Sequence, residues 1–168
     1  MQIYVDFDGV ILDTDAVLDS EFKKVNNLSR SDFVQNYDWE KLVNSSLVIN
    51  NSLEYLSNTK YETYILSKIS SMKEGIAKIK YLREHNVLVN IHLVPTKISK
   101  SDVVNPLGSI LIDDKIYNLD EWSKKGGISI FFNKDNLDTD IKGIKNTKYP
   151  QINNLSILIS NNLNDLEK

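Results

Sequence analysis

Five short apolar runs recur along the chain, and each is separated from the next by a polar or amphipathic stretch. The runs cover residues 2–7, 61–66, 87–94, 109–112 and 128–132. Runs of this length that are rich in Val, Ile, Leu and aromatic residues are typical of buried β-strands. Strands that alternate with helices favour a parallel sheet covered on both faces. We therefore expect an α/β protein with a Rossmann-like parallel sheet flanked by helices.

The segments between the runs carry helical patterns. Residues 15–26 are amphipathic, residues 28–60 are typical of two or three short helices, and residues 119–125 form a short helix closed by two glycines. Residues 71–85 have the strongest periodicity, which predicts one inward face. The residues expected on that face are Met72, Ile76, Ile79 and Leu82. The tail from 133 to 168 is rich in Asn and Asp, and its apolar stretch 155–159 fits either a last helix or an edge strand.

Composition narrows the possible partners. The chain has 168 residues, which suits one compact domain with a small insertion, and its net charge of −3 gives no overall attraction to nucleic acid or anionic lipid. The absence of cysteine excludes disulfides, thiolate zinc sites and cysteine nucleophiles. No apolar run approaches the ~20 residues that span a bilayer. A basic region followed by an apolar stretch is missing at the N-terminus, so we expect a cytoplasmic protein with no membrane or nucleic-acid partner.

Polar side chains follow four of the predicted strands. In chain order they are Asp6 and Asp8, Ser67, the loop lysines Lys97 and Lys100, and the pair Asp113 and Asp114. Ligands of parallel α/β sheets bind at the carboxyl ends of the strands, so these groups are expected to converge. Carboxylate oxygens suit Mg²⁺, and without a cation the clustered carboxylates would raise each other's pKa values. The pattern predicts a site for phosphate and Mg²⁺.

The order DxDGV, Ser, Lys and DD, each after an apolar strand, resembles the haloacid dehalogenase (HAD) superfamily of phosphotransferases over roughly residues 1–132. Any one of these motifs is common in loops and helix caps, so it is their joint order that carries the resemblance. The resemblance implies that Asp6 is the nucleophile and forms an aspartyl-phosphate. It also implies that Asp8 protonates the leaving oxygen and then deprotonates a water, while its backbone carbonyl binds Mg²⁺. Gly9 fits a tight turn where the backbone approaches the phosphate.

The remaining motifs imply further roles. Ser67 would bind a phosphoryl oxygen, although a serine at this point is more often a cap for the next helix, a task open to Ser70 or Ser71. Lys100 would neutralise the phosphoryl group and Asp6; Lys97 in the same loop is an open alternative, and Lys68 a weaker one. Asp114 would complete the Mg²⁺ ligands with Asp113 in support, and the reverse order is open. His85 and His92 lack the spaced partners of a metal site.

In this superfamily the core performs the chemistry and an inserted cap selects the substrate. The resemblance therefore implies a core of residues 1–14 and 60–168 and a small helical cap of residues 15–59. Tyr37 and Trp39 are the aromatic residues that could stack on a base, or they could form the core of the cap itself. The small cap and the Leu-Ile-Asp-Asp sequence are loosely similar to the 5′(3′)-deoxyribonucleotidase branch.

These inferences predict a Mg²⁺-dependent phosphomonoester hydrolase that acts on a small soluble phosphate ester. A nucleoside monophosphate is favoured over a sugar phosphate. The alternatives are a sugar-phosphate phosphatase or phosphomutase of the same fold, or a regulatory module that binds phosphate without turnover. The sequence does not define an oligomeric state.

Overall fold

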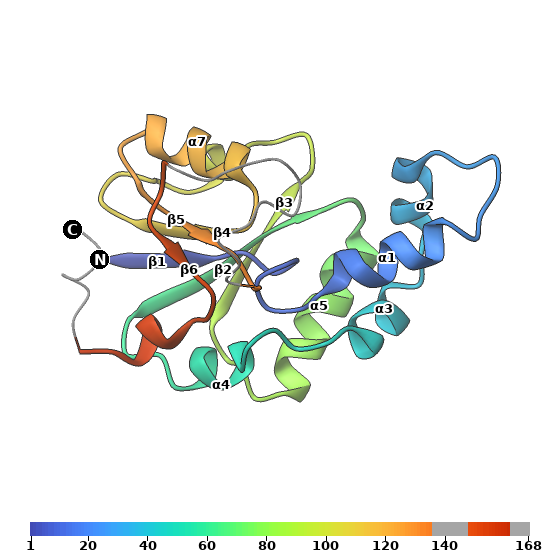
Figure 1. Ribbon diagram of the computed structural model, residues 1–168. Helices are drawn as coiled ribbons and strands as arrows, with labels where there is room; N and C mark the ends of the chain where they lie inside the picture. Colours follow the sequence, from blue (N-terminus) through green and yellow to red (C-terminus); the bar gives the residue numbers. More distant parts are fainter. Residues whose placement is uncertain (136–147, 162–168) are drawn as a thin grey trace.

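The chain folds around one parallel sheet, as predicted (Figure 1). The structure is a computed structural model that describes residues 1–135 and 148–161. Within these residues the sheet has six strands in the order β3-β2-β1-β4-β5-β6. The strands are β1 (Gln2–Val5), β2 (Glu62–Ile69), β3 (Asn90–Pro95), β4 (Ile110–Asp113), β5 (Ile128–Phe132) and β6 (Gln151–Ile152). The expected Rossmann-like α/β class is confirmed, and each of the five predicted runs contributes a strand.

The register of the central strands determines where the polar motifs meet. Val5 at the end of β1 pairs with Ile65 of β2 on one side and with Ile112 of β4 on the other. All three strands run in the same direction, so their carboxyl ends lie at one edge of the sheet. The acidic residues that follow β1 and end β4 are therefore neighbours.

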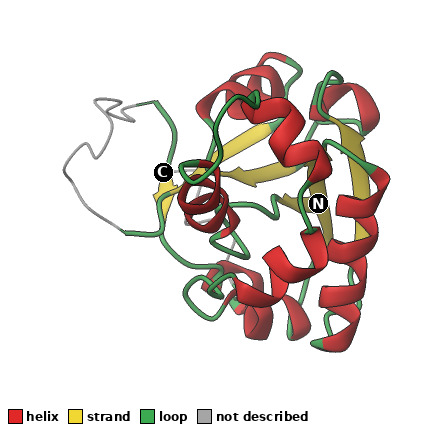
Figure 2. Ribbon diagram, turned by 90° about the vertical axis from the view of Figure 1, so that its right-hand side faces the viewer, coloured by secondary structure: helices red, strands yellow, loops and turns green. Residues whose placement is uncertain are grey.

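Helices cover both faces of the sheet (Figure 2). They are α1 (Thr14–Phe22), α2 (Arg30–Asn36), α3 (Trp39–Ser45), α4 (Ser52–Ser57), α5 (Met72–Glu84), α6 (Lys100–Val103), α7 (Ile116–Lys124) and the short 3₁₀ helix η1 (Ser156–Ile159). Apolar side chains of α4, α5 and η1 join the larger core cluster, and those of α7 join a smaller cluster on the opposite face. This division follows from strand alternation, which points successive side chains to opposite faces.

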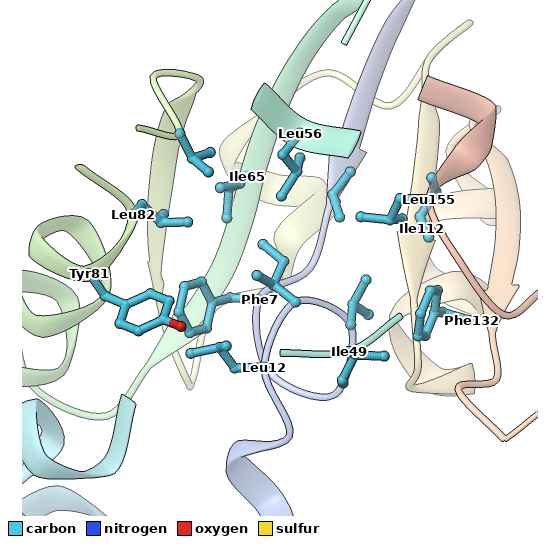
Figure 3. Close-up of a cluster of buried hydrophobic side chains, with 14 of the residues drawn as sticks. Phe7, Leu12, Ile49, Leu56, Ile65, Tyr81, Leu82, Ile112, Phe132 and Leu155 are labelled. Carbon is cyan, nitrogen blue, oxygen red and sulfur yellow. The ribbon is translucent and has the colours of Figure 1, made fainter. Parts of the chain in front are cut away.

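The larger core cluster links the sheet to the residues between β1 and β2. Phe7, Ile65 and Ile112 come from the sheet and its loops, and Leu82 reaches them from α5 (Figure 3). Trp39 of α3 belongs to the same cluster, together with Leu18, Phe33, Leu42 and Val43. The helices that precede β2 therefore share the apolar core of the sheet.

Backbone hydrogen bonds join the chain just after β1 to the chain that returns toward β2. The amide of Asp13 donates to Leu47 O at 2.9 Å, and the amide of Ile49 donates to Ile11 O at 3.0 Å. Helices α1 and α2 extend beyond the carboxyl end of β1 (Figure 1). The division into a core of residues 1–14 and 60–168 and a cap of residues 15–59 stays a prediction.

Helix α5 presents a different face to the sheet from the predicted one. Met72 and Ile76 were expected to point inward, but they are 68% and 61% exposed. The buried positions are Glu74, Gly75, Ala77, Lys78, Tyr81 and Leu82. The prediction is confirmed for Leu82 but wrong for Met72 and Ile76, because it placed charged residues outside, whereas Glu74 and Lys78 form a buried ion pair.

Gly75 lets α5 approach the sheet closely. A Cβ atom at this position would lie 2.6 Å from Cδ1 of Leu93 in β3, which is closer than two carbon atoms can pack. Glycine costs a helix interior about 1 kcal/mol relative to alanine. At this position the close packing explains its presence.

The C-terminal part differs from the prediction in one respect. The sequence did not predict β6, which pairs in parallel with β5. The stretch 155–159 is mainly the 3₁₀ helix η1, nearer to the helical alternative. The rest of the predicted tail, 136–147 and 162–168, lies outside the described residues. Across the residues that are described, no helix has both the length and the apolar character to cross a membrane.

Candidate active site

Asp6 and Lys100 form a buried ion pair at the end of β1. The Lys100 ammonium lies 2.8 Å from Asp6 Oδ1 and 2.6 Å from Asp113 Oδ2. Lys100 is the first residue of α6, which packs on the sheet beside β2 and α7. It is 1% exposed, so its charge acts on the two carboxylates with little screening by water. Lys100 therefore lies against the predicted nucleophile, and its role toward phosphate stays a prediction.

Burial has the largest effect on the pKa of the Asp6 carboxyl group. Burial and the nearby charge of Asp113 raise the pKa of Asp6 to about 6, although Lys100 acts in the opposite direction. Burial lowers the pKa of Lys100, but Asp113 and Asp6 outweigh that effect, and its pKa lies above the ordinary value. Lys100 therefore stays charged and supplies a fixed cation to the site.

The acidic pair at the end of β4 divides into two different environments. Asp113 accepts hydrogen bonds from Lys100, from the side-chain amide of Asn118 and from the backbone amide of Lys115. Asp114 Oδ2 accepts a hydrogen bond from the Lys115 ammonium at 2.7 Å. Burial and the charge of Asp113 raise the pKa of Asp114 to about 8, against the opposing effect of Lys115. The sequence analysis did not identify Asn118 or Lys115 as site residues.

Three carboxylates are arranged in a way that fits a divalent cation. Asp6, Asp113 and Asp114 each offer an oxygen, and these oxygens lie within 4.8 Å of one another. Asp114 Oδ1 is buried and has no hydrogen-bond partner among the described residues. A buried carboxylate oxygen without a donor is costly, and a hard cation would satisfy it. The residues therefore fit Mg²⁺, with Asp6 and Asp114 as the side chains that would hold it.

Gly9 brings the backbone of the loop after β1 against this acidic cluster. Its φ angle is +76°, in the left-handed region that favours glycine. A Cβ atom here would lie 2.4 Å from Asp114 Oδ2. A side chain at position 9 would therefore displace the carboxylate of Asp114.

Asp8 points to a different set of partners from those of Asp6. Its Oδ1 accepts a hydrogen bond from the hydroxyl of Thr14 at 2.7 Å, and its Oδ2 lies 2.5 Å from the ammonium of Lys78. The Asp8 side chain is 24% exposed, whereas that of Lys78 is fully buried. Asp8 therefore keeps access to the surface while both of its oxygens are held.

Lys78 is a site residue that the sequence analysis missed. Its ammonium also contacts Glu74 Oε1 at 2.6 Å and Ser67 Oγ at 3.0 Å. Burial lowers the pKa of Lys78, but Asp8 and Glu74 more than compensate, and the pKa lies above its ordinary value. A sequence signal existed, because Glu74 and Lys78 share one helix face with Tyr81 at the spacing of successive turns.

The other residues that the sequence predicted for the site differ in their burial and in their contacts. Ser67 is fully buried inside β2, which continues to Ile69. The N-cap of α5 is Ser71, while Ser70 donates hydrogen bonds to Glu74 from the cavity wall. Lys97 is exposed, which leaves Lys100 as the loop lysine that contacts Asp6.

A cavity of about 380 Å³ opens onto the acidic residues. Asp6, Asp8, Lys68, Lys115 and Asn118 line it from the sheet side, and Arg30 and Trp39 line it from the helices that follow β1. The indole of Trp39 is 4% exposed and donates to Val34 O at 2.9 Å. Tyr37 is half-buried against the ring of Phe33 and does not line this cavity. Of the two aromatic residues predicted from the sequence, Trp39 therefore lines the cavity, whereas Tyr37 packs against another side chain.

Neither histidine lies in the site. His85 follows the last turn of α5, where its Nδ1 lies 2.8 Å from Tyr81 O, and its ring stacks on the ring of Tyr81. His92 lies in β3 against Tyr4 and Tyr64. Both positions agree with the expectation that neither histidine is a ligand.

Comparison with solved structures identifies the fold. The chain is similar to a haloacid dehalogenase-like protein of unknown function, ATU0790 from Agrobacterium tumefaciens, at 13% identity and a TM-score of 0.59, over 94% of this chain and 95% of that one. It is also similar to the magnesium-bound HAD hydrolase YfnB from Bacillus subtilis, at 12% identity and a TM-score of 0.59, over 94% and 96% of the two chains.

A third similar structure carries a phosphate. It is D,D-heptose 1,7-bisphosphate phosphatase from B. bronchiseptica complexed with magnesium and phosphate, at 13% identity and a TM-score of 0.51, over 92% and 93% of the two chains. No protein-family model and no curated protein matches the chain by sequence.

The sheet order and these likenesses define the class of fold. The protein has a parallel α/β fold, and an acidic site lies at the carboxyl ends of its central strands. More particularly, it has the fold of the solved HAD proteins to which it is similar, as the resemblance of its motifs predicted. The looser resemblance to the deoxyribonucleotidase branch stays a prediction.

Proposed function

We propose that the protein is a Mg²⁺-dependent phosphomonoester hydrolase that forms an aspartyl-phosphate at Asp6. The single observation that carries the proposal is the buried contact between Asp6 and Lys100, beside an Asp114 oxygen to which no described residue donates a hydrogen bond. A nucleophilic carboxylate needs a fixed cation near the phosphoryl group that it attacks. The phosphate-bound and magnesium-bound structures of the same fold support the same chemistry.

The proposed reaction has two steps. A carboxylate oxygen of Asp6 attacks phosphorus, the bond from phosphorus to the ester oxygen breaks, and Asp8 gives a proton to the leaving oxygen. A water then attacks the same phosphorus, Asp8 takes a proton from it, and the bond from phosphorus to Asp6 breaks. The products are an alcohol and inorganic phosphate; Asp8 begins and ends as the protonated acid, and Asp6 begins and ends as the free carboxylate.

The surrounding residues have separate tasks in this scheme. Lys100 would stabilise the negative charge that spreads over the phosphoryl oxygens in the transition state. Mg²⁺ held by Asp6, Asp114 and the carbonyl of Asp8 would supply additional positive charge to the bound phosphate. Asp113 is already saturated by hydrogen bonds. That saturation supports Asp114 as the ligand and Asp113 as its neighbour.

The substrate that we propose is a small phosphate ester, with a nucleoside monophosphate as the first candidate. Trp39 supports this choice because it is an aromatic wall of the cavity beside Asp6 and Asp8. A sugar phosphate is the second candidate, and the similar heptose bisphosphate phosphatase acts on such a compound. A panel of mononucleotides and sugar phosphates, compared by kcat/KM, distinguishes the two.

The test of the proposed activity uses p-nitrophenyl phosphate. We expect release of inorganic phosphate with Mg²⁺ and none with EDTA. Asp6→Asn should abolish turnover while circular dichroism and Tm show a folded protein, because the amide cannot form the acyl phosphate. Asp102→Asn is the matched control, since Asp102 lies on α6 with a side chain that is 56% exposed. Absence of Mg²⁺-dependent turnover on every ester tried would contradict the proposal.

A further inference from the structure

Lys78 is the most completely buried charged group that the proposed reaction does not use. We propose that Lys78 is a positioning residue that holds Asp8 and Ser67 in place beside the leaving group. This inference rests on the proposed function. It differs from the role of Lys100, which contacts the nucleophile itself.

The ammonium group of Lys78 is surrounded by hydrogen-bond acceptors. Asp8, Glu74 and Ser67 receive its hydrogen bonds at 2.5, 2.6 and 3.0 Å, and the carbonyl oxygen of Lys68 lies at 3.2 Å. An ammonium has three protons to donate. The ammonium is therefore saturated, and it links a residue of the catalytic loop to one of β2.

The walls around Lys78 keep water from its charge. The ring centroid of Phe7 lies 5.1 Å from the ammonium and that of Trp39 lies 5.0 Å from it. The Lys78 side chain is 0% exposed and does not line the cavity. It therefore acts on a bound substrate only through Asp8 and Ser67, which is the definition of a positioning residue.

Stability alone does not explain a lysine at this position. A buried ion pair is often no more stabilising than well-packed apolar residues, because desolvation offsets the attraction between the charges. Glu74 lies on the same helix, and it could have been satisfied by Ser70, which donates to its other oxygen from the backbone amide and the hydroxyl. The distinctive partner of Lys78 is Asp8, seventy positions earlier in the chain.

The consequence for the chemistry concerns the orientation of Asp8. Thr14 holds Oδ1 and Lys78 holds Oδ2, so the carboxyl group cannot rotate freely. A general acid must lie within hydrogen-bond reach of the leaving oxygen, and a misplacement of about 1 Å can cost about 10²-fold in rate. Loss of Lys78 should therefore harm the proton transfer more than the attack by Asp6.

The test compares two esters that differ in their need for a proton. The phenolate of p-nitrophenyl phosphate leaves without protonation, whereas the alkoxide of an alkyl phosphate such as glycerol 2-phosphate does not. We expect Lys78→Met to lower kcat/KM on the alkyl ester by about 10²-fold and to lower kcat/KM on the aryl ester much less, because kcat/KM reports only the steps up to departure of the alcohol. Lys78→Arg should restore part of the loss. Lys73→Met, an exposed position on α5, is the control.

Each possible result either supports or contradicts the positioning role of Lys78. Equal losses of kcat/KM on both esters, or unchanged kcat/KM on the alkyl ester, would overturn the positioning role. Lys78→Gln is one bond shorter but retains hydrogen-bond donors without charge, and it carries the same comparison if Lys78→Met does not fold. Absence of turnover by the unaltered protein on both esters contradicts the proposed function. Turnover by the unaltered protein with equal losses in the variants contradicts only this inference.

Discussion

The two buried lysines approach the loop after β1 from opposite faces of the sheet. Lys100 comes from α6 and contacts Asp6, while Lys78 comes from α5 and contacts Asp8. Each of the two carboxylates therefore has its own cation, although they are only two residues apart. This arrangement separates the like charges that the sequence places side by side, and it allows them different tasks.

At the residue scale, Lys100 and Lys97 give a direct comparison. Lys100→Met leaves Asp6 and Asp113 buried without their cation, which typically costs about 3–5 kcal/mol of stability. We expect a lower free energy of unfolding in urea and loss of turnover at the same time. Lys97→Met, at an exposed position in the same loop, should leave both unchanged. The opposite ranking would make Lys97 the phosphate lysine.

At the element scale, the strands could be predicted and one helix face could not. Apolar runs locate β1 and β4 because most of their buried positions are apolar, and the acidic residues at their carboxyl ends mark the site. Hydropathy fails to predict the inward face of α5, because that face carries Glu74 and Lys78, which hydropathy assigns to solvent. Their i,i+4 spacing is visible in the sequence, but Asp8, the second partner of Lys78, is distant in sequence, so only the fold shows that this pair faces inward.

The true orientation of α5 predicts which of its apolar residues matter. Leu82 is 1% exposed, so Leu82→Ala should destabilise the protein by about 2–5 kcal/mol through the cavity that it leaves. Ile76 is 61% exposed, and Ile76→Ala should change stability by less than about 0.5 kcal/mol. Urea unfolding of both variants measures the difference. Similar losses would mean that α5 lies as its periodicity first indicated.

At the scale of the whole molecule, the acidic cluster links stability to pH and to metal. The pKa values of Asp6 and Asp114 are raised to about 6 and about 8, so the folded chain binds these protons more tightly than the unfolded chain. Their contribution to stability is therefore complete below about pH 4, the ordinary carboxyl range. It is lost as pH rises through the two raised values.

This linkage gives a measurable prediction. In EDTA, Tm should fall as pH rises from about 5 to about 8, because the folded state must give up its extra protons. Mg²⁺ should raise Tm more at about pH 8 than at about pH 5, since it competes with protons for the same carboxylates. Asp114→Asn should flatten both trends. A Tm that rises with pH in EDTA would contradict the assignment of these groups.

The absence of a side chain at Gly75 has a consequence beyond packing. Position 75 lies against Leu93, and Lys78 lies less than one helical turn further along α5. The first atom that a methyl group at position 75 would meet is the end of the Leu93 side chain, so either Leu93 must change its conformation or α5 must shift. The contact between one glycine and one leucine thus helps to set the position of the helix that carries a buried charge.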